Sequence, residues 1–75
     1  MKKEQYKLNR TIADNIIKLR EIHKTSRNKL AEDMGIDYKS LSKYECAKAS
    51  ISVYNLLKIS KYFNVPISYM IENEK

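Results

Sequence analysis

The sequence has few of the residues that interrupt helices or that form covalent and metal cross-links. It contains one glycine, Gly35, one proline, Pro66, one cysteine, Cys46, and no tryptophan. A single cysteine excludes an internal disulfide, and together with the lone His23 it leaves too few ligands for a tetrahedral zinc site. No apolar run approaches the roughly 18 residues that a bilayer span requires. Packing of apolar side chains must therefore stabilise the fold, and we expect no cofactor and no membrane segment.

The length allows one domain. Chains of about this size bury only about 60% of the surface that they expose when unfolded. We expect a single domain over residues 1–75, with a loose polar arm at residues 1–7 and a polar tail at residues 72–75. The opening residues MKKEQYKLNR are not followed by the apolar core and cleavage site of a signal peptide, so we expect a cytoplasmic protein.

Acidic residues are outnumbered. Fifteen Lys and Arg against nine Asp and Glu give a net charge of +6, which favours nucleic acid as a partner before an acidic protein or an acidic membrane surface. The excess is spread along the chain, so no basic tail accounts for binding by itself. A membrane-surface role ranks last, because the polar face of the first expected helix mixes Asp14 and Glu21 with its lysines.

Catalytic groups are equally scarce. One histidine, one cysteine and one glycine provide neither a nucleophile with its base nor a glycine-rich phosphate loop. We therefore expect that the protein is not an enzyme.

The apolar residues recur at spacings of three and four, which predicts an all-α fold of five helices. The first helix is expected over residues 8–23, with Thr11 and Asp14 as a capping box near its start. The second begins after Ser26 as N-cap, and Gly35 ends it by taking the left-handed conformation. The apolar residues expected to face the core from these two helices are Leu8, Ile12, Ile16, Leu19, Leu30, Ala31 and Met34.

The remaining helices have similar start and stop signals. Asp37 and Ser52 are the expected N-caps of the third and fourth helices, each preceded by an isoleucine that can pack on the first turn. Asn64 ends the fourth helix, and Pro66 begins a short fifth helix. The residues expected to face inward from the fourth helix are Val53, Leu56, Leu57 and Phe63, and Ile67, Met70 and Ile71 form the apolar stripe of the fifth.

The segment at about residues 26–46 has the pattern of a helix-turn-helix, with two short helices joined by a turn that contains glycine. In the second of them Leu41, Tyr44 and Glu45 fall on one side, and Lys39, Ser42 and Lys43 fall on the other. In this motif the second helix enters the DNA major groove, where lysine can donate to guanine O6 and N7 and serine can bond several base edges. Asp37 would repel phosphates there unless capping occupies its carboxylate.

Four segments together make a resemblance to a known family. They are "IIKLRE", "SRNKLAEDMGI", "SLSKYE" and "LLKISKYFNVPISYMI". Over about residues 11–71 the chain resembles the Cro-type (Xre, lambda-repressor-like) helix-turn-helix family of bacterial and phage regulators. The resemblance implies a compact five-helix DNA-binding domain in which Arg20 pairs across the core with Glu45.

The resemblance also implies the DNA contacts. Arg27, which follows the N-cap of the second helix, is expected to touch a phosphate, as is Lys48 in the loop after the recognition helix. The residues implied to face bases or the adjacent backbone are Tyr38, Lys39, Ser42 and Lys43. The family often has glycine where this chain has Lys24 and Ala47, and proline at Ile51, which leaves the shape of those two turns open.

The expected function is therefore a sequence-specific, double-stranded DNA-binding transcriptional regulator, either a repressor or a small controller protein. One short recognition helix covers few base pairs, so we expect a homodimer on paired half-sites. The residues expected at its interface are Ile67, Tyr69, Met70 and Ile71. The alternative is a protein-interaction module, such as an antitoxin or anti-repressor with the same fold. No pocket for a small-molecule effector can be inferred from the sequence.

Overall fold

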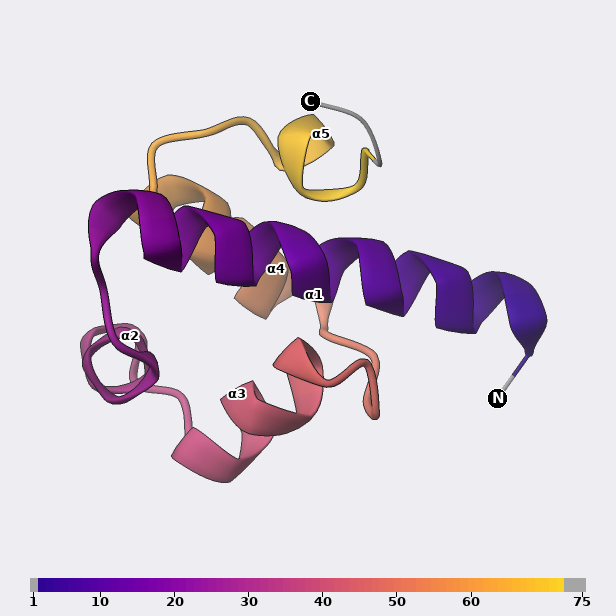
Figure 1. The fold of residues 1–75 in the computed structure, drawn as a ribbon, viewed down its shortest axis with the longest axis horizontal. Coiled ribbons are helices and arrows are strands. Elements are labelled where there is room, and N and C mark those ends of the chain that lie inside the picture. The colour runs from indigo at the N-terminus through magenta and orange to yellow at the C-terminus, as the bar shows by residue number, and fades with distance from the viewer. Residues whose placement is uncertain (1, 73–75) are drawn as a thin grey trace.

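A computed structural model describes residues 2–72, and these residues form five α-helices and no strand. The helices are α1 (Lys3–His23), α2 (Arg27–Met34), α3 (Tyr38–Glu45), α4 (Val53–Tyr62) and α5 (Ile67–Met70). α1 crosses the middle of the molecule, with α2 and α3 on one side of it and α5 on the other (Figure 1). The all-α, five-helix prediction is confirmed. No helix in the described part of the chain is both long enough and apolar enough to cross a membrane.

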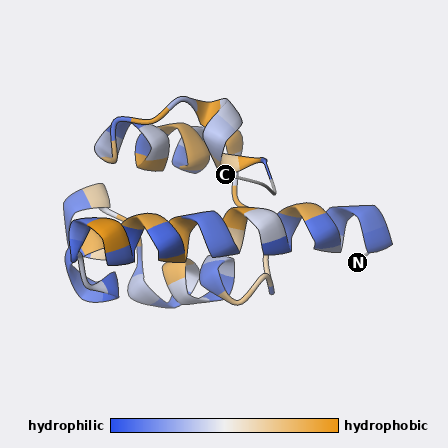
Figure 2. Ribbon diagram, turned by 45° about the horizontal axis from the view of Figure 1, so that its top comes forward, coloured by the Kyte–Doolittle hydropathy of each residue, from blue (hydrophilic) through white to orange (hydrophobic). Residues whose placement is uncertain are grey.

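The core forms where the other helices pack against α1 and against one another. Its members are Ile12, Ile16, Leu19, Leu30, Ala31, Met34, Leu41, Leu56, Ile59, Phe63 and Met70. All of the inward residues predicted for the second helix are buried, as are three of the four predicted for the first. Hydrophobic residues recur at intervals along α1 and α4, as amphipathic helices require (Figure 2).

Three of the predicted core residues are exposed. Leu8 is 46% exposed because the N-terminal part of α1 projects beyond the other helices (Figure 1). Val53 and Leu57 are 74% and 40% exposed. α4 turns Leu56 and Ile59 toward the core, and at 100° per residue Leu57 then falls on the outer flank of the helix. Val53, the first residue of α4, follows the same period as Leu56 but remains exposed.

The start of the first helix was also predicted wrongly. α1 begins at Lys3 with Lys2 as N-cap, so residues 3–7, expected as an arm, are helical. Thr11 and Asp14 consequently lie inside the helix and form no capping box, and Asp14 pairs instead with Arg10 at 3.0 Å. The segment contains no glycine or proline that would end a helix. Residue 1 of the expected arm and residues 73–75 of the expected tail lie outside the described residues.

The three predicted side-chain caps are present. Ser26 Oγ accepts from the backbone N–H of Lys29 and Ser52 Oγ from that of Asn55, each at 3.0 Å. Asp37 Oδ2 accepts from the backbone N–H of Lys39 at 3.1 Å. Each cap satisfies a donor that the helix itself leaves without a partner.

Four helices end with a residue in the left-handed conformation, although only one of these residues is glycine. The φ angles are 53° at Lys24, 66° at Gly35, 60° at Ala47 and 58° at Asn64. Each end has the same pair of backbone bonds; after α3, the N–H of Lys48 donates to the carbonyl of Lys43 at 2.9 Å and that of Ala47 to Tyr44 at 3.2 Å. The turns at Lys24 and Ala47 thus have the backbone conformation that glycine favours.

A buried asparagine holds the last helix in place. Asn15 Nδ2 lies 2.8 Å from the carbonyl oxygen of Met70, 3.2 Å from that of Tyr69 and 3.0 Å from that of Glu72. α5 is one turn long, so its C-terminal carbonyls have no partner within the helix. α1 therefore supplies the donor that fixes the end of the domain.

Candidate nucleic-acid interface

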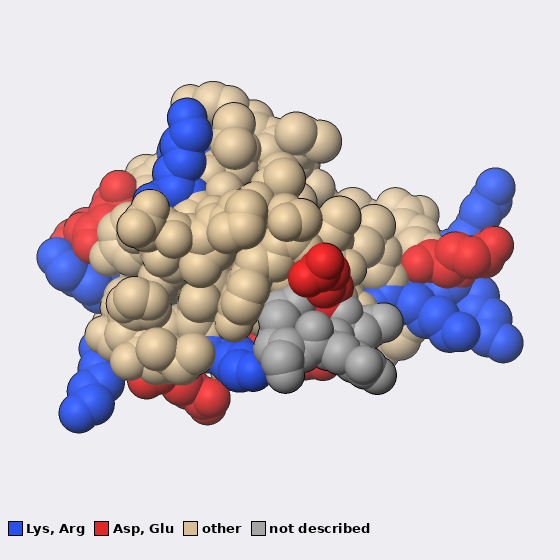
Figure 3. All heavy atoms as spheres, turned by 90° about the horizontal axis from the view of Figure 1, so that it is seen from above, with Lys and Arg blue, Asp and Glu red and all other residues tan. Residues whose placement is uncertain are grey.

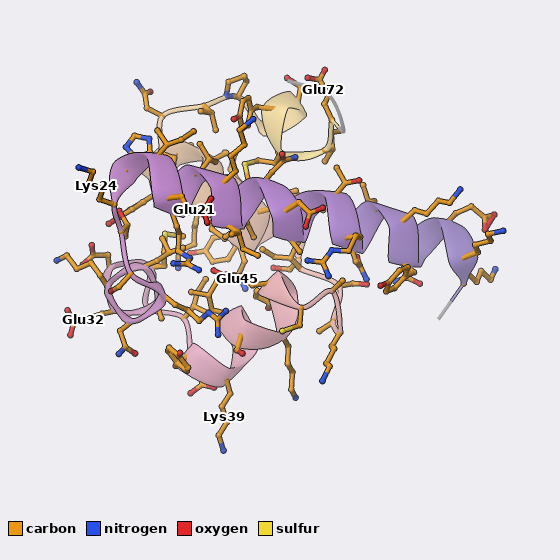
Figure 4. All side chains as sticks on the ribbon, viewed as in Figure 1. Glu21, Lys24, Glu32, Lys39, Glu45 and Glu72 are labelled. Carbon is orange, nitrogen blue, oxygen red and sulfur yellow. The ribbon has the colours of Figure 1, made fainter. Side chains whose placement is uncertain are left out.

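The outer side of α3 is cationic and accessible. Lys39 and Lys43 are exposed, and Lys39 points away from the body of the molecule (Figure 4). Tyr38 at the start of the helix is 45% exposed, whereas Ser42 is half-buried. Figure 4 places Glu45 on the other side of α3, between this helix and α1. The helix thus presents its lysines outward, as the sequence pattern predicted.

The turn between α2 and α3 fixes the position at which α3, and with it the cationic outer side, starts. Gly35 ends α2 in the left-handed conformation, and Asp37 starts α3 two residues later. The Asp37 carboxylate is used as the N-cap, which offsets part of its repulsion of an approaching phosphate. The two helices of the motif are therefore joined by a short turn with satisfied backbone groups.

Behind α3, Arg20 and Glu45 form a bidentate ion pair. Arg20 Nε donates to Glu45 Oε2 and Arg20 Nη2 to Glu45 Oε1, both at 2.8 Å. The Glu45 side chain has no exposed surface. Arg20 Nη1 also donates to the carbonyl of Thr25 at 3.2 Å, so the same guanidinium joins α1, the loop before α2 and α3. This is the pair that the family resemblance implies.

The same carboxylate binds a second arginine, which the sequence did not predict. Arg27 Nε donates to Glu45 Oε1 at 3.0 Å, and Arg27 Nη1 donates to Ser42 Oγ at 3.3 Å. The guanidinium carbon also lies 5.8 Å from the centre of the Tyr38 ring, within cation–π range. Partial burial opposes the charge, but the hydrogen bonds and the charges of Glu45 and Tyr38 outweigh it and raise the pKa of Arg27. Arg27, expected to contact a phosphate, is here bonded to α3.

The loop after α3 is held against α1. Ser50 Oγ accepts hydrogen bonds from Gln5 Nε2 at 2.6 Å and from Asn9 Nδ2 at 3.1 Å. Arg10 Nη2 donates to the backbone carbonyl of Glu45 at 3.2 Å. Lys48 is exposed within this loop, so its side chain is accessible beside the C-terminal end of α3. No signal in the sequence pointed to these polar contacts, because they join residues more than thirty positions apart.

The residues predicted for a dimer interface do not share one surface. Met70 is fully buried in the core and Tyr69 packs against it, whereas Ile67 and Ile71 are exposed. The reason is that a single helical turn has one inward side, which Met70 occupies against α1. Met70 is therefore a core residue and is not accessible to a second subunit.

Apolar side chains are exposed on α4 as well. Val53 and Tyr54 are 74% and 70% exposed, and Leu57 lies beside them on the outer side of the helix. Seen from the side of α5, much of the surface is uncharged, with charged side chains mostly at its margins (Figure 3). We call Val53, Tyr54, Leu57, Ile67 and Ile71 the apolar face.

Comparison with known families agrees with this geometry. A model of the helix-turn-helix family matches residues 16–70, well over half of the chain. No curated protein and no solved structure matches the sequence. The matched segment includes all of α2, α3 and the turn between them.

Proposed function

Because the chain belongs to the Xre, lambda-repressor-like helix-turn-helix family, a family of DNA-binding domains, we propose that it is a sequence-specific regulator of transcription. In this proposal α3 enters the major groove, and Lys39 and Lys43 donate to base edges or to the flanking phosphates. Lys48 contacts a phosphate beside the groove. We propose a binding function without catalysis.

One observation carries the proposal. The lysines of α3 project outward from a helix whose inner side is anchored by a carboxylate with no exposed surface. A rigid helix loses little further conformational freedom when it binds, so its side chains meet the bases in a defined register. A lysine-bearing helix packed only loosely would attract DNA without discriminating between sequences.

Selection of bound fragments from random duplex DNA tests the proposal. We expect one preferred sequence, and we expect Lys43→Ala to weaken binding to it by about 1 to 3 kcal/mol. Lys18→Ala is the matched control, because it removes one exposed lysine from α1, outside α3 and the apolar face. Equal effects of the two variants, or no enriched sequence, would contradict the proposed role of α3.

We propose that the regulator acts as a homodimer and that its partner is a second copy bound through the apolar face. α3 and α5 lie on opposite sides of α1 (Figure 1), so a contact centred on α5 alone would direct the two recognition helices apart. A contact that includes Val53, Tyr54 and Leu57 of α4 allows both α3 helices to face one duplex. The domain measures 31 × 26 × 20 Å, which suits half-sites about 34 Å apart.

Sedimentation with and without the selected duplex tests the dimer. We expect Tyr54→Lys to shift the protein toward monomer and Ile71→Lys to have a smaller effect, since Tyr54 is the more exposed of the two. A wild-type protein that remains monomeric at tens of micromolar, free and on DNA, would contradict the proposal. A palindromic selected sequence would support it independently.

The exposed apolar side chains also favour a second candidate function, that of a protein-interaction module such as an antitoxin or anti-repressor. Its binding would depend on the apolar face and little on salt, whereas DNA binding weakens steeply as salt rises. Within the first proposal, repression is the simplest outcome, because a dimer that occupies the duplex excludes other proteins from the same site.

A further inference from the structure

Arg27 contacts three residues that form one row on α3. Tyr38, Ser42 and Glu45 are spaced by four and then three positions, which places them in one row along the helix. Ser42, predicted on the outward side, is half-buried and lies between the outward lysines and Glu45. The Arg27 guanidinium binds the carboxylate at one end of this row, the hydroxyl in the middle and the ring at the other end. One side chain from the first turn of α2 thus contacts residues at both ends and in the middle of α3.

On this geometry we infer that Arg27 acts on DNA binding mainly as a positioning residue for the recognition helix; the inference depends on the proposed DNA-binding function. Arg27 Nε and Nη1 are engaged by Glu45 and Ser42, so a phosphate could meet only the remaining N–H groups of the guanidinium. Such an approach would not require the bonds to α3 to break. The contacts within the protein can therefore be retained when DNA binds.

The contact to Ser42 has a consequence for base recognition. A serine hydroxyl has one proton to donate and two lone pairs that accept. Because Arg27 Nη1 occupies one lone pair of Ser42 Oγ, the hydroxyl proton remains available for an acceptor in the groove. Arg27 also restricts the Tyr38 ring, so two of the four candidate base-reading side chains depend on it.

The test compares the selected duplex with a random-sequence duplex over a range of salt concentrations. We expect Arg27→Met to weaken binding to the selected duplex by about tenfold and binding to random duplex by less than about twofold. The salt slope should equal that of Lys18→Ala, a charge-matched control on α1. Equal losses on both duplexes, with a slope smaller by about 0.9 than that of the control, would identify a phosphate contact and overturn the inference.

A conservative variant separates the two roles further. Lysine keeps the charge of arginine but lacks the fork of donors that reaches a carboxylate and a hydroxyl together. We expect Arg27→Lys to lose sequence preference nearly as much as Arg27→Met does. Recovery of most of the affinity and preference by lysine would overturn the inference.

Amide hydrogen exchange of the free protein tests the positioning without DNA. We expect the amides of α3 to exchange faster in Arg27→Met and Arg27→Lys than in Lys18→Ala, while those of α1 and α4 keep their rates. Unchanged exchange in α3 would overturn the inference even if the variants bind DNA poorly. If wild-type protein bound no duplex, the proposed function would fail, and the exchange rates would still decide whether Arg27 holds α3.

Discussion

The Glu45 carboxylate accepts hydrogen bonds from two guanidinium groups while its side chain has no exposed surface. Arg20 and Arg27 reach it from α1 and α2, so three helices meet at one acidic group. A buried charge is tolerated only where it is paired, and each arginine here stabilises the carboxylate that the other also binds.

Removal of this charge is expected to destabilise the protein strongly. Glu45→Gln keeps the shape of the side chain but leaves both arginines without their anion, which should lower the free energy of unfolding by about 3 to 5 kcal/mol. A chain of this length has about 4 to 11 kcal/mol in total, so the variant should be marginally folded. Urea denaturation measures the loss, and Glu21→Gln on the exposed side of α1 is the control. A change of about 1 kcal/mol or less, typical of an exposed pair, would contradict this role.

The left-handed residues Lys24 and Ala47 provide a second test at single positions. Glycine adopts this conformation without the steric strain of a Cβ, so Lys24→Gly should stabilise the protein by about 0.5 to 1 kcal/mol. Ala47→Gly should have almost no net effect, because the relief of strain is offset by the loss of a methyl group that is buried. Thermal or urea unfolding of the two variants checks the difference. Equal stabilisation by both would show that the Ala47 methyl contributes nothing.

The sequence patterns predicted the starts and ends of most helices, but they predicted less well which side chains other helices cover. Ser26, Asp37 and Ser52 were predicted as caps because capping depends on neighbours within three residues. Gly35 and Asn64 were predicted as ends for the same local reason. By contrast, Leu8 follows the helical period, but no other helix extends far enough to cover it. Apart from the start of α1, local chemistry sets the element boundaries, and only the packed structure shows which faces are covered.

In the candidate site, too, features set by helical periodicity were predictable and contacts set by the packing of helices were not. The exposed lysines of α3 follow from periodicity, because the opposite side of the helix carries Leu41 and Tyr44. The contact between Arg27 and Glu45 could not be predicted in that way, since it depends on how α2 and α3 cross. The same is true of Asn15, whose three carbonyl partners follow it by more than fifty positions.

A polar clamp between α2 and α4 predicts a pH dependence. Tyr62 Oη donates to Asp33 Oδ2 at 2.6 Å, and Lys29 Nζ lies 3.2 Å from Asp33 Oδ1. The Tyr62 hydrogen bond first, and then the Lys29 ammonium group, lower the pKa of Asp33. The folded protein therefore binds this proton less readily than the unfolded chain. The stabilisation is present above the ordinary aspartate pKa of about 3.9 and is lost as the pH falls through the lower folded value.

Urea denaturation of wild type and Asp33→Asn across pH checks this sign. The variant lacks the titrating group, so the difference in unfolding free energy should be constant from about pH 5 to 7 and should shrink below about pH 4. Other carboxylates titrate in both proteins and cancel in the difference. A difference that stays constant to pH 2, or that grows in acid, would contradict the clamp.

In the whole molecule, the cationic side of α3 and the apolar face are separate surfaces. α3 lies on one side of α1 and α5 on the other, and α4 packs against α5 and α2. The proposed binding of a duplex and a second subunit at the same time requires such a separation. The same arrangement explains why the +6 charge is compatible with a largely uncharged surface around α5 (Figure 3).

The central claim is that the outer side of α3 meets the DNA bases. Titration of isotope-labelled protein with the selected duplex, followed by amide chemical shifts, tests it most directly. We expect the largest changes at Tyr38, Lys39, Ser42 and Lys43, with smaller changes around Lys48 and at the apolar face. Largest changes on α4 and α5, with the α3 amides unmoved by saturating duplex, would contradict the claim.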